Sequence, residues 1–235
     1  MRKPLTFFAI LGAAVATVAA PATAAPAKKS TPAPADWTRA VVETPEGGFR
    51  MGNPAAKVRL VEYASLTCPH CASFAASAKG PLAKHVRSGR VSFEYRPYVL
   101  NGFDLMATLL TRCAGPSRFF AFSDTLFETQ SQWLGRIDAV SEADRQRIGA
   151  LPEDEQLAAI AEAAGLTQVA VQHGVPAEKA KACLADAAAV QRLEEIGAAA
   201  DASGVSGTPT FSVNGSLVHA HEWAELEPLI AQAGG

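Results

Sequence analysis

Cysteine is scarce in this chain, with four residues among 235. That number is too small for a scaffold built from disulfides, so burial of apolar side chains must hold the fold, and 49% of the residues are hydrophobic. The formal net charge is only −2, so no strongly basic surface argues for a nucleic-acid partner. The chain has no repeat of fixed period, phosphate-binding loop or nucleotide fingerprint.

The N-terminal segment lacks a hydrophobic run long enough for an ordinary membrane span. Residues 5–20 are apolar and uncharged, but about 16 residues fall short of the roughly 20 that a spanning helix needs. Two basic residues precede this run and a small-residue A-x-A site follows at 22–24, which predicts a cleaved secretory signal peptide over residues 1–24. A membrane anchor is the alternative. The next segment, 25–36, is rich in Ala, Pro and Lys and predicts a disordered linker.

Apolar patterning predicts a β-α-β unit over residues 37–100. The stretch KVRLVEYASL at 57–66 predicts a strand with apolar residues on both faces, as in a sheet that is covered on both sides. A helix follows, with a break expected at Gly80-Pro81, and VSFEYRPYVL at 91–100 predicts a second strand. A further short strand is indicated near Val41-Val42.

No convincing strand occurs across residues 102–189. Alanine-rich segments separated by Gly and Pro predict an all-helical block, which we assign to residues 101–189. Beyond it, a long helix, a hairpin with an Asn214-Gly215 turn and a short amphipathic helix complete the chain. The sequence therefore predicts an α/β domain, made of 37–100 and 190–235, with a helical insertion.

Two of the cysteines, Cys68 and Cys71, stand two residues apart between the predicted strand and helix. A zinc site needs about four ligands, and no second Cys-x-x-Cys or His-x(3–5)-His pair completes one, so we expect no metal. A structural disulfide across so small a loop would stabilise little. A redox dithiol needs this spacing, because residues i and i+3 at a helix start share one face and the helix N–H groups stabilise a thiolate.

The dipeptide between the cysteines favours the oxidising direction. Pro69 fits the first helical turn, where its missing N–H costs nothing. The imidazole of His70 is expected beside the sulfurs, where it would stabilise a thiolate of Cys68 and lower its pKa. Because a dithiol whose reduced form is stabilised is a better oxidant, the motif predicts a site that gives disulfides rather than removes them.

The motif Cys-Pro-His-Cys after a buried strand, the helical insertion and the later stretch SGTPTF resemble the DsbA-like thiol:disulfide oxidoreductases of the thioredoxin superfamily. The resemblance covers about residues 37–235 and implies a thioredoxin-like fold, with a central mixed sheet flanked by helices. It implies that Cys68 is the exposed nucleophile and Cys71 its partner sulfur. Pro209 matches a cis proline that would expose the backbone of Thr208 to an extended client chain.

Glu62 stands six residues before Cys68, on the predicted strand. It matches a buried acid of the DsbA-like proteins, and the resemblance implies that it relays a proton to Cys71. A paired charge at the edge of the sheet is the alternative interpretation.

The other two cysteines, Cys113 and Cys183, both fall in the helical block. If bonded, they close a loop of about 70 residues, worth roughly 4 kcal/mol in the chain-entropy description. In an oxidising compartment we expect this disulfide, with two buried free thiols as the alternative. Some DsbA-like proteins carry such a second disulfide in the insertion.

Motif and resemblance together predict a periplasmic oxidase. Its Cys68–Cys71 disulfide would pass to exported proteins with free thiols through a mixed disulfide, and a DsbB-like membrane quinone reductase would reoxidise it. We expect no cofactor, and we expect a monomer because residues 25–57 contain no recognisable dimerisation module. A disulfide isomerase or reductase of the same compartment, and a non-enzymatic client-binding module, are the alternatives.

Overall fold

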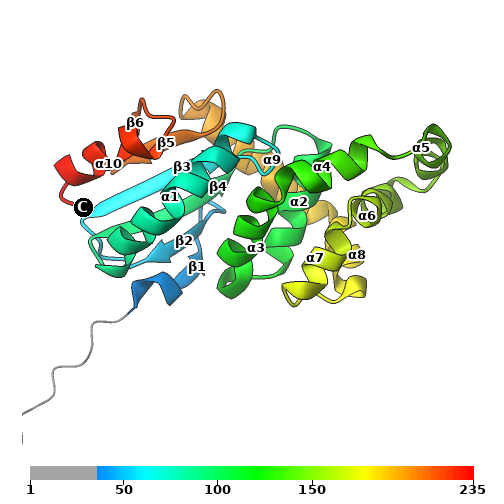
Figure 1. Cartoon of the computed structure of the whole chain (residues 1–235), viewed down its shortest axis with the longest axis horizontal. Helices are drawn as coiled ribbons and strands as arrows, with labels where there is room; N and C mark the ends of the chain where they lie inside the picture. Colours follow the sequence, from blue (N-terminus) through cyan, green and yellow to red (C-terminus); the bar gives the residue numbers. More distant parts are fainter. Residues whose placement is uncertain (1–35) are drawn as a thin grey trace, which may run out of the picture. The chain divides into compact units, whose positions relative to one another are not determined.

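A mixed sheet of six strands, in the order β1-β2-β4-β3-β5-β6, forms the centre of the fold (Figure 1). The computed structural model describes residues 36–235, so the predicted signal peptide at 1–24 lies outside the described residues, as does the predicted linker apart from Asp36. The strands are β1 (Val41–Glu43), β2 (Phe49–Gly52), β3 (Val58–Ala64), β4 (Val91–Pro97), β5 (Thr210–Val213) and β6 (Ser216–Val218). Only β3 and β4 pair in parallel, which confirms the predicted mixed sheet.

Strand β2 is an element that the sequence analysis did not predict. It forms a hairpin with β1 and then pairs antiparallel with β4, opposite Phe93 and Tyr95. The turn before it requires glycine, because Gly47 has a φ of 86° while its N–H donates to the carbonyl oxygen of Thr44. A strand of four residues that includes an arginine has little apolar alternation of its own, so pairing with β4 decides its conformation.

One face of the sheet carries much of the apolar core. The strand register puts Phe49, Leu60 and Phe211 on this face together with Glu62. Helices α1 (Pro69–Arg87), α3 (Pro116–Glu128) and α10 (Trp223–Gln232) cover it. The rings of Phe49 and Phe119 stack with their centroids 3.9 Å apart, which joins β2 to α3. This packing fixes α1, whose N-terminus carries the cysteine pair, against the sheet.

Helix α1 runs without interruption from Pro69 to Arg87, which corrects the predicted break at Gly80-Pro81. Pro81 lacks the N–H of an ordinary helical residue, and an internal proline costs about 3 kcal/mol. Leu82 and Val86 are buried in the core beyond it. Burial of such side chains contributes about 1.5–3 kcal/mol each, so packing offsets the local cost of the proline.

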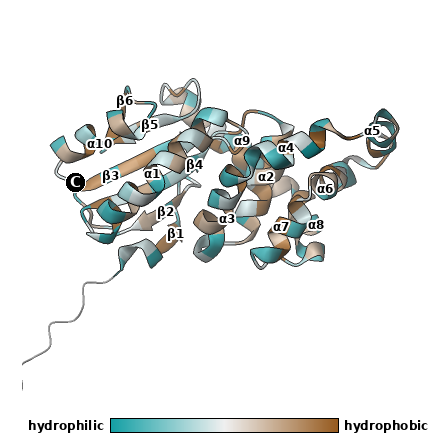
Figure 2. Cartoon of the chain, viewed as in Figure 1, coloured by the Kyte–Doolittle hydropathy of each residue, from teal (hydrophilic) through white to brown (hydrophobic). Residues whose placement is uncertain are grey.

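All elements of the predicted insertion at 101–189 are helices, which confirms the helical insertion in the predicted fold class. Besides α3 it contains α2 (Gly102–Cys113), α4 (Gln130–Asp138), α5 (Glu142–Gly149), α6 (Glu153–Ala163), α7 (Leu166–Gln172), α8 (Ala177–Leu184) and the start of α9 (Ala187–Ala202). Outside the insertion, a short 3-10 helix, η1 (Trp37–Arg39), precedes β1. Hydrophilic residues dominate α5, which buries none of its side chains (Figure 2). In the part of the chain that the structure describes, no helix has the length and apolarity to span a bilayer.

Candidate active site

The loop after β3 brings both cysteines of the motif to the start of α1. Cys68 is the N-cap residue, Pro69 lies in the first turn and Cys71 follows inside the helix. Neither sulfur is bonded, so the structure shows the dithiol. Cys71 is completely buried and Cys68 exposes only 6% of its surface, which corrects the expectation of an exposed nucleophile.

The segment before β5 lies directly against Cys68 and accounts for part of this burial. The Sγ atom of Cys68 lies 3.3 Å from the carbonyl oxygen of Thr208, to which Cys68 donates a hydrogen bond when it is protonated. The Thr208–Pro209 peptide bond is cis, as the resemblance implied, and Pro209 is buried while Thr208 is half-buried. The ends of β3 and β5 therefore form one site, because these two strands are neighbours in the sheet.

Two polar side chains of the helical insertion hold the loop that precedes Cys68. Asp104 of α2 is fully buried and accepts a hydrogen bond of 2.8 Å from the N–H of Leu66. Gln130 of α4 donates to the carbonyl oxygens of Leu66 and Cys68, at 2.9 and 3.0 Å. Neither residue was predicted, because nothing in their local sequence links them to a loop more than 30 residues away.

Hydrogen bonding and burial separate the pKa values of the two thiols. The hydrogen bond from the Cys71 thiol is the main influence on Cys68, and with the main-chain N–H groups of Cys71 and His70 it lowers the pKa of Cys68 to about 5, against the opposing effect of burial. The same hydrogen bond, followed by burial and the charge of Glu62, raises the pKa of Cys71 far above its ordinary value. At neutral pH the dithiol therefore carries its negative charge on Cys68 and its proton on Cys71.

The side chain of His70 does not support the Cys68 thiolate in the way that the sequence predicted. Its side chain is exposed, and within residues 36–235 its imidazole makes no hydrogen bond to either sulfur. The main-chain N–H of His70 is one of the groups that support the Cys68 thiolate, with a smaller effect than the Cys71 thiol and the main-chain N–H of Cys71. The first N–H groups of a helix point toward the N-cap position, so this donor comes from the backbone and not from the histidine side chain.

Glu62 lies on β3, with 3% of its surface exposed. Strand β3 runs between β4 and β5, and Glu62 has no ion pair among the described residues, so the structure excludes a paired charge at a sheet edge. Burial first, and the negative charge of Cys68 second, raise the pKa of Glu62 to about 8. The carboxyl group therefore holds a proton at neutral pH, close enough to the dithiol that the charge of Cys68 affects Glu62 and the charge of Glu62 affects Cys71.

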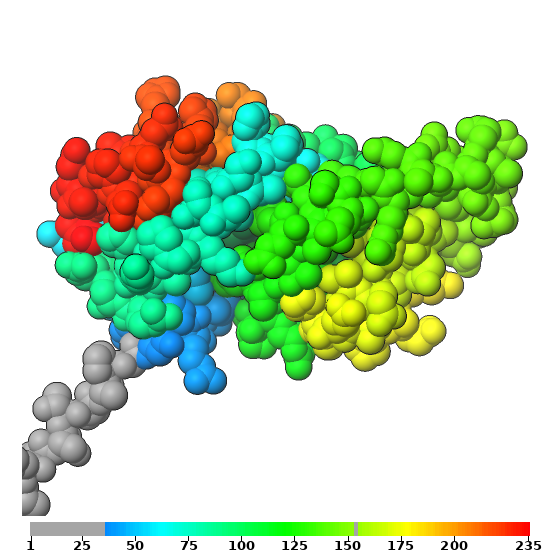
Figure 3. All heavy atoms as spheres, viewed as in Figure 1, coloured from blue at the N-terminus to red at the C-terminus, as the bar shows by residue number. Residues whose placement is uncertain are grey.

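A cavity of about 230 Å³ lies next to Glu62, between the sheet and helices α1 and α3. The Oε1 atom of Glu62 and the Oγ atom of Ser123 are both buried without a hydrogen-bond partner in the described part of the chain. On the surface, where Figure 3 shows a hollow between α1 and α3, Lys79 pairs with Asp124 at 3.2 Å and with Glu128 at 2.6 Å. A cavity lined by unpaired polar atoms has partners for water.

The second cysteine pair forms a disulfide in the structure. Cys113 of α2 and Cys183 of α8 are bonded, with 6.1 Å between their Cα atoms, so the bond joins two helices of the insertion. No group of three or more His, Cys, Asp or Glu suited to a metal ion occurs in the described part of the chain.

The fold and the site define a thioredoxin-like protein with a dithiol at a helix N-terminus and a helical insertion after the second strand of the β-α-β unit. A family model described as thioredoxin matches residues 44–232. The chain therefore belongs to the thioredoxin family.

Solved structures and curated relatives agree with this assignment. The protein-disulfide isomerase of Novosphingobium aromaticivorans is 34% identical, with a TM-score of 0.71 over 79% of this chain and 97% of that one. The α-DsbA1 of Wolbachia pipientis is 18% identical, with a TM-score of 0.61 over 78% of this chain and 89% of that one, a likeness of fold alone. A candidate protein-disulfide oxidoreductase of Rickettsia bellii is 29% identical over 173 residues, which cover 72% of this chain but only 58% of the relative.

Proposed function

We propose that this protein is a thiol:disulfide oxidoreductase of the DsbA type, which donates disulfides to exported proteins in the periplasm. The separation of the two thiol pKa values carries the proposal, because the pKa of Cys68 is lowered to about 5 while that of Cys71 is raised. A stabilised thiolate favours the reduced form, so the oxidised form readily transfers its disulfide. The related structures and curated relatives support the same class of reaction.

Disulfide donation requires two thiol–disulfide exchange steps. In the first, a client thiolate attacks Cys68 in the Cys68–Cys71 disulfide, so that a mixed disulfide forms and Cys71 leaves as a thiolate. In the second, another client thiolate attacks the client sulfur of the mixed disulfide and releases Cys68 as a thiolate. The client gains a disulfide and the protein takes up two electrons. The low pKa of Cys68 makes it a good leaving group in the second step.

Glu62 supplies the proton for the first step in this proposal. Cys71 has a raised pKa, so its thiolate takes up a proton as soon as it leaves. Glu62 is protonated at neutral pH because its pKa is raised to about 8. Water in the neighbouring cavity then restores the proton on the carboxylate.

The client would bind beside Thr208, whose main chain lies next to the sulfur of Cys68. An extended client segment that adds as a strand at this point would bring its own thiolate to the disulfide. For the return to the oxidised form, we propose a DsbB-like quinone reductase in the membrane. The predicted signal peptide at 1–24 supports the proposed location.

A disulfide isomerase is the second candidate. The observation that favours it is the description of the Novosphingobium aromaticivorans protein, 34% identical to this chain, as a protein-disulfide isomerase. An isomerase uses the same Cys68 thiolate but must be kept reduced to attack a wrong disulfide in its client.

Two assays distinguish the candidates. We expect the oxidised protein to convert a reduced unfolded substrate with two cysteines to its disulfide form stoichiometrically, and a redox titration against glutathione to give a potential at or above about −180 mV. A potential near −270 mV, together with no oxidation of the substrate, would contradict the oxidase proposal. Recovery of a scrambled-disulfide substrate by the reduced protein alone would favour the isomerase.

The Cys68→Ser variant provides the control for both assays. It lacks the sulfur through which both reactions pass, so we expect it to neither oxidise nor rearrange the substrate. If client binding and the cellular phenotype are unchanged in this variant, the protein acts as a binding module and the dithiol is not its function.

A further inference from the structure

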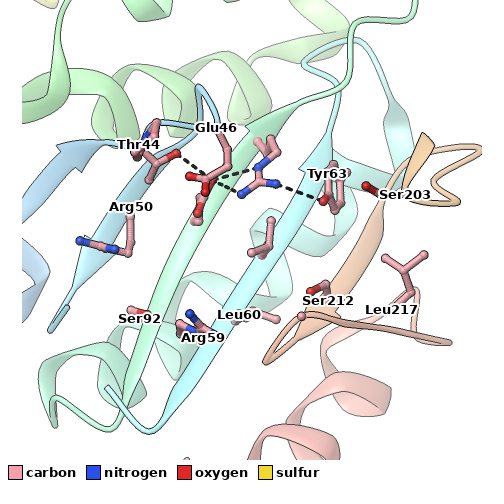
Figure 4. Close-up of a pocket in the computed structure, with 15 residues that line it drawn as sticks. Thr44, Glu46, Arg50, Arg59, Leu60, Tyr63, Ser92, Ser203, Ser212 and Leu217 are labelled. Carbon is pink, nitrogen blue, oxygen red and sulfur yellow. Dashed lines mark hydrogen bonds and ion pairs between the residues drawn. The ribbon is translucent and has the colours of Figure 1, made fainter. Parts of the chain in front are cut away.

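The second face of the sheet forms a groove that is separate from the redox site. Successive side chains of a strand point to opposite faces, so Val61 and Tyr63 line this groove while Glu62 faces the core. Helix α9 covers only one end of this face, where Ala200 and Val205 pack against Tyr63. The remaining hollow has a volume of about 450 Å³, within the usual range for small-molecule sites (Figure 4).

Three arginines line the groove, and one of them has an acidic partner. Arg96 donates hydrogen bonds of 2.9 and 2.6 Å to Glu94 and one of 3.2 Å to the hydroxyl of Tyr63. Arg50 and Arg59 form no ion pair with any residue that the structure describes, and the Nε atom of Arg50 is buried without a hydrogen-bond partner. A buried donor without an acceptor is unfavourable, so Arg50 gains when its side chain turns toward an acceptor in the groove.

The strand register puts the two unpaired arginines on opposite sides of β4. Arg50 lies opposite Glu94 and Arg59 lies opposite Ser92. A separation of two strands with an offset of two residues corresponds to about 12 Å between their Cα atoms. Both arginine side chains are long enough to turn toward an anion placed between them, and Ser92 between them adds a hydroxyl group.

Two apolar side chains of the groove, Val61 and Leu217, lie on either side of Ser212. Val61, Ser212 and Leu217 follow one another across β3, β5 and β6, and Leu217 is 41% exposed. We propose that the groove binds a small organic anion, whose carboxylate or phosphate contacts Arg50 and Arg59 and whose apolar part lies on Val61 and Leu217. Guanidinium groups fit these anions with paired hydrogen bonds, which gives such a site its specificity.

Two probes test this proposal on the full chain. Phenyl phosphate carries both the anion and an apolar ring, whereas inorganic phosphate carries the anion alone. In calorimetry at about 0.15 M salt, where long-range attraction is screened, we expect phenyl phosphate to saturate one site with a Kd on the order of millimolar. Inorganic phosphate should bind more weakly. NMR amide shifts should map both probes to the groove and not to the loop around Cys68.

Four variants assign the binding to the groove. We expect Arg59→Ala to weaken binding of phenyl phosphate about tenfold. Arg50→Lys keeps the charge but loses the planar guanidinium group, and should also weaken the binding of phenyl phosphate. Leu217→Ser should weaken phenyl phosphate and leave phosphate unchanged. Arg90→Ala is the control, because Arg90 is exposed outside the groove, where its Nε bonds to Ser88.

The redox reaction provides an independent readout in these variants. No residue of the groove belongs to the dithiol site, so disulfide exchange should stay at the parent rate in all four. Absence of saturable binding, or equal weakening by Arg90→Ala and Arg59→Ala, would overturn the proposal and leave the proposed redox function unaffected.

Discussion

The side-chain amide of Gln130 donates a hydrogen bond of 3.0 Å to the main-chain carbonyl oxygen of Cys68. The same nitrogen reaches the carbonyl oxygen of Leu66 at 2.9 Å. Gln130 is the first residue of α4 and exposes only 8% of its surface. The helical insertion therefore contacts the redox loop through a buried polar side chain and holds the main chain of the reactive cysteine.

Replacement of Gln130 by Ala tests this contact. The two carbonyl oxygens would lose their donor in a buried place, so we expect the free energy of unfolding to fall by about 1–3 kcal/mol. Urea denaturation of the oxidised protein measures the change. Gln132→Ala is the matched control, since Gln132 lies exposed on the same helix. Equal stability of the two variants would show that the hydrogen bonds of Gln130 contribute nothing to the free energy of unfolding.

The titration of Cys68 is a second prediction. Thiolate absorbance of the reduced protein should show a midpoint near pH 5. In Cys71→Ala the main hydrogen-bond donor to Cys68 is absent, so the midpoint should rise. The remaining cysteines do not contribute, because Cys113 and Cys183 are bonded. A midpoint near 8.5 in the parent, the value of a free thiol, would contradict the electrostatics of the site.

The same pKa predicts how pH affects the two redox forms. The pKa of Cys68 is lowered on folding, so its thiolate stabilises the reduced protein fully above the ordinary thiol pKa of about 8.5. This contribution decreases as the pH falls and is lost near pH 5. The oxidised protein has no such thiolate. We therefore expect the stability advantage of the reduced over the oxidised form to shrink between pH 8.5 and pH 5, measured by urea denaturation of both forms.

The contribution of Glu62 to the free energy of unfolding should depend on pH in the opposite direction to that of Cys68. Folding raises the pKa of this carboxyl from 4.5 to about 8, so between these values the folded state holds a proton that the unfolded state has lost. The contribution of Glu62 to the free energy of unfolding thus falls as pH rises, by at most about 1.4 kcal/mol per pH unit. Glu62→Gln removes this dependence, so its stability relative to the parent should increase from pH 5 to pH 8.

An exposed carboxyl supplies the comparison for Glu62. Glu194 lies exposed on α9, so Glu194→Gln should keep the pH dependence of the parent. If Glu62→Gln and Glu194→Gln follow the same curve, the carboxyl of Glu62 is not protonated in the folded protein at neutral pH and cannot donate a proton to Cys71.

The disulfide in the insertion should stabilise the fold without affecting the dithiol. It closes a separation of 70 residues, for which the chain-entropy description gives about 4 kcal/mol. We expect the double variant Cys113→Ala/Cys183→Ala to lose stability of this order in thermal and urea denaturation. The thiolate midpoint of Cys68 should not move. A shift of that midpoint would show that the disulfide also influences the redox site.

Local patterns in the sequence were sufficient for much of the fold. The strand at 57–66, the helix that starts after Cys68 and the hairpin at Asn214-Gly215 all depend on short-range periodicity and turn chemistry, and the structure has them. Strand β2 and the uninterrupted course of α1 were not predictable in this way. In both, packing against the sheet overrides a weak or unfavourable local preference.

The site was predictable only as far as the motif extends. Spacing alone indicates that Cys68 and Cys71 lie at a helix start, and the structure agrees. Asp104, Gln130 and the covering of Cys68 by Thr208 depend on contacts between distant parts of the chain, which no local pattern encodes. His70 acts on Cys68 through its main-chain N–H and not through its imidazole, and the Cys71 thiol has the larger effect on the Cys68 pKa.

The distant contacts to Cys68 also impose an order of events during biosynthesis. Gln130 follows Cys68 by 62 residues and Thr208 follows it by 140. At about 5–20 residues per second, the cysteine waits about 7–28 s for the segment that covers it. During that time the nascent chain carries an unprotected Cys-x-x-Cys, with neither the burial nor the fixed loop of the finished protein. The contacts that hold and cover Cys68 are thus acquired late, when α4 and then the last strands join the fold.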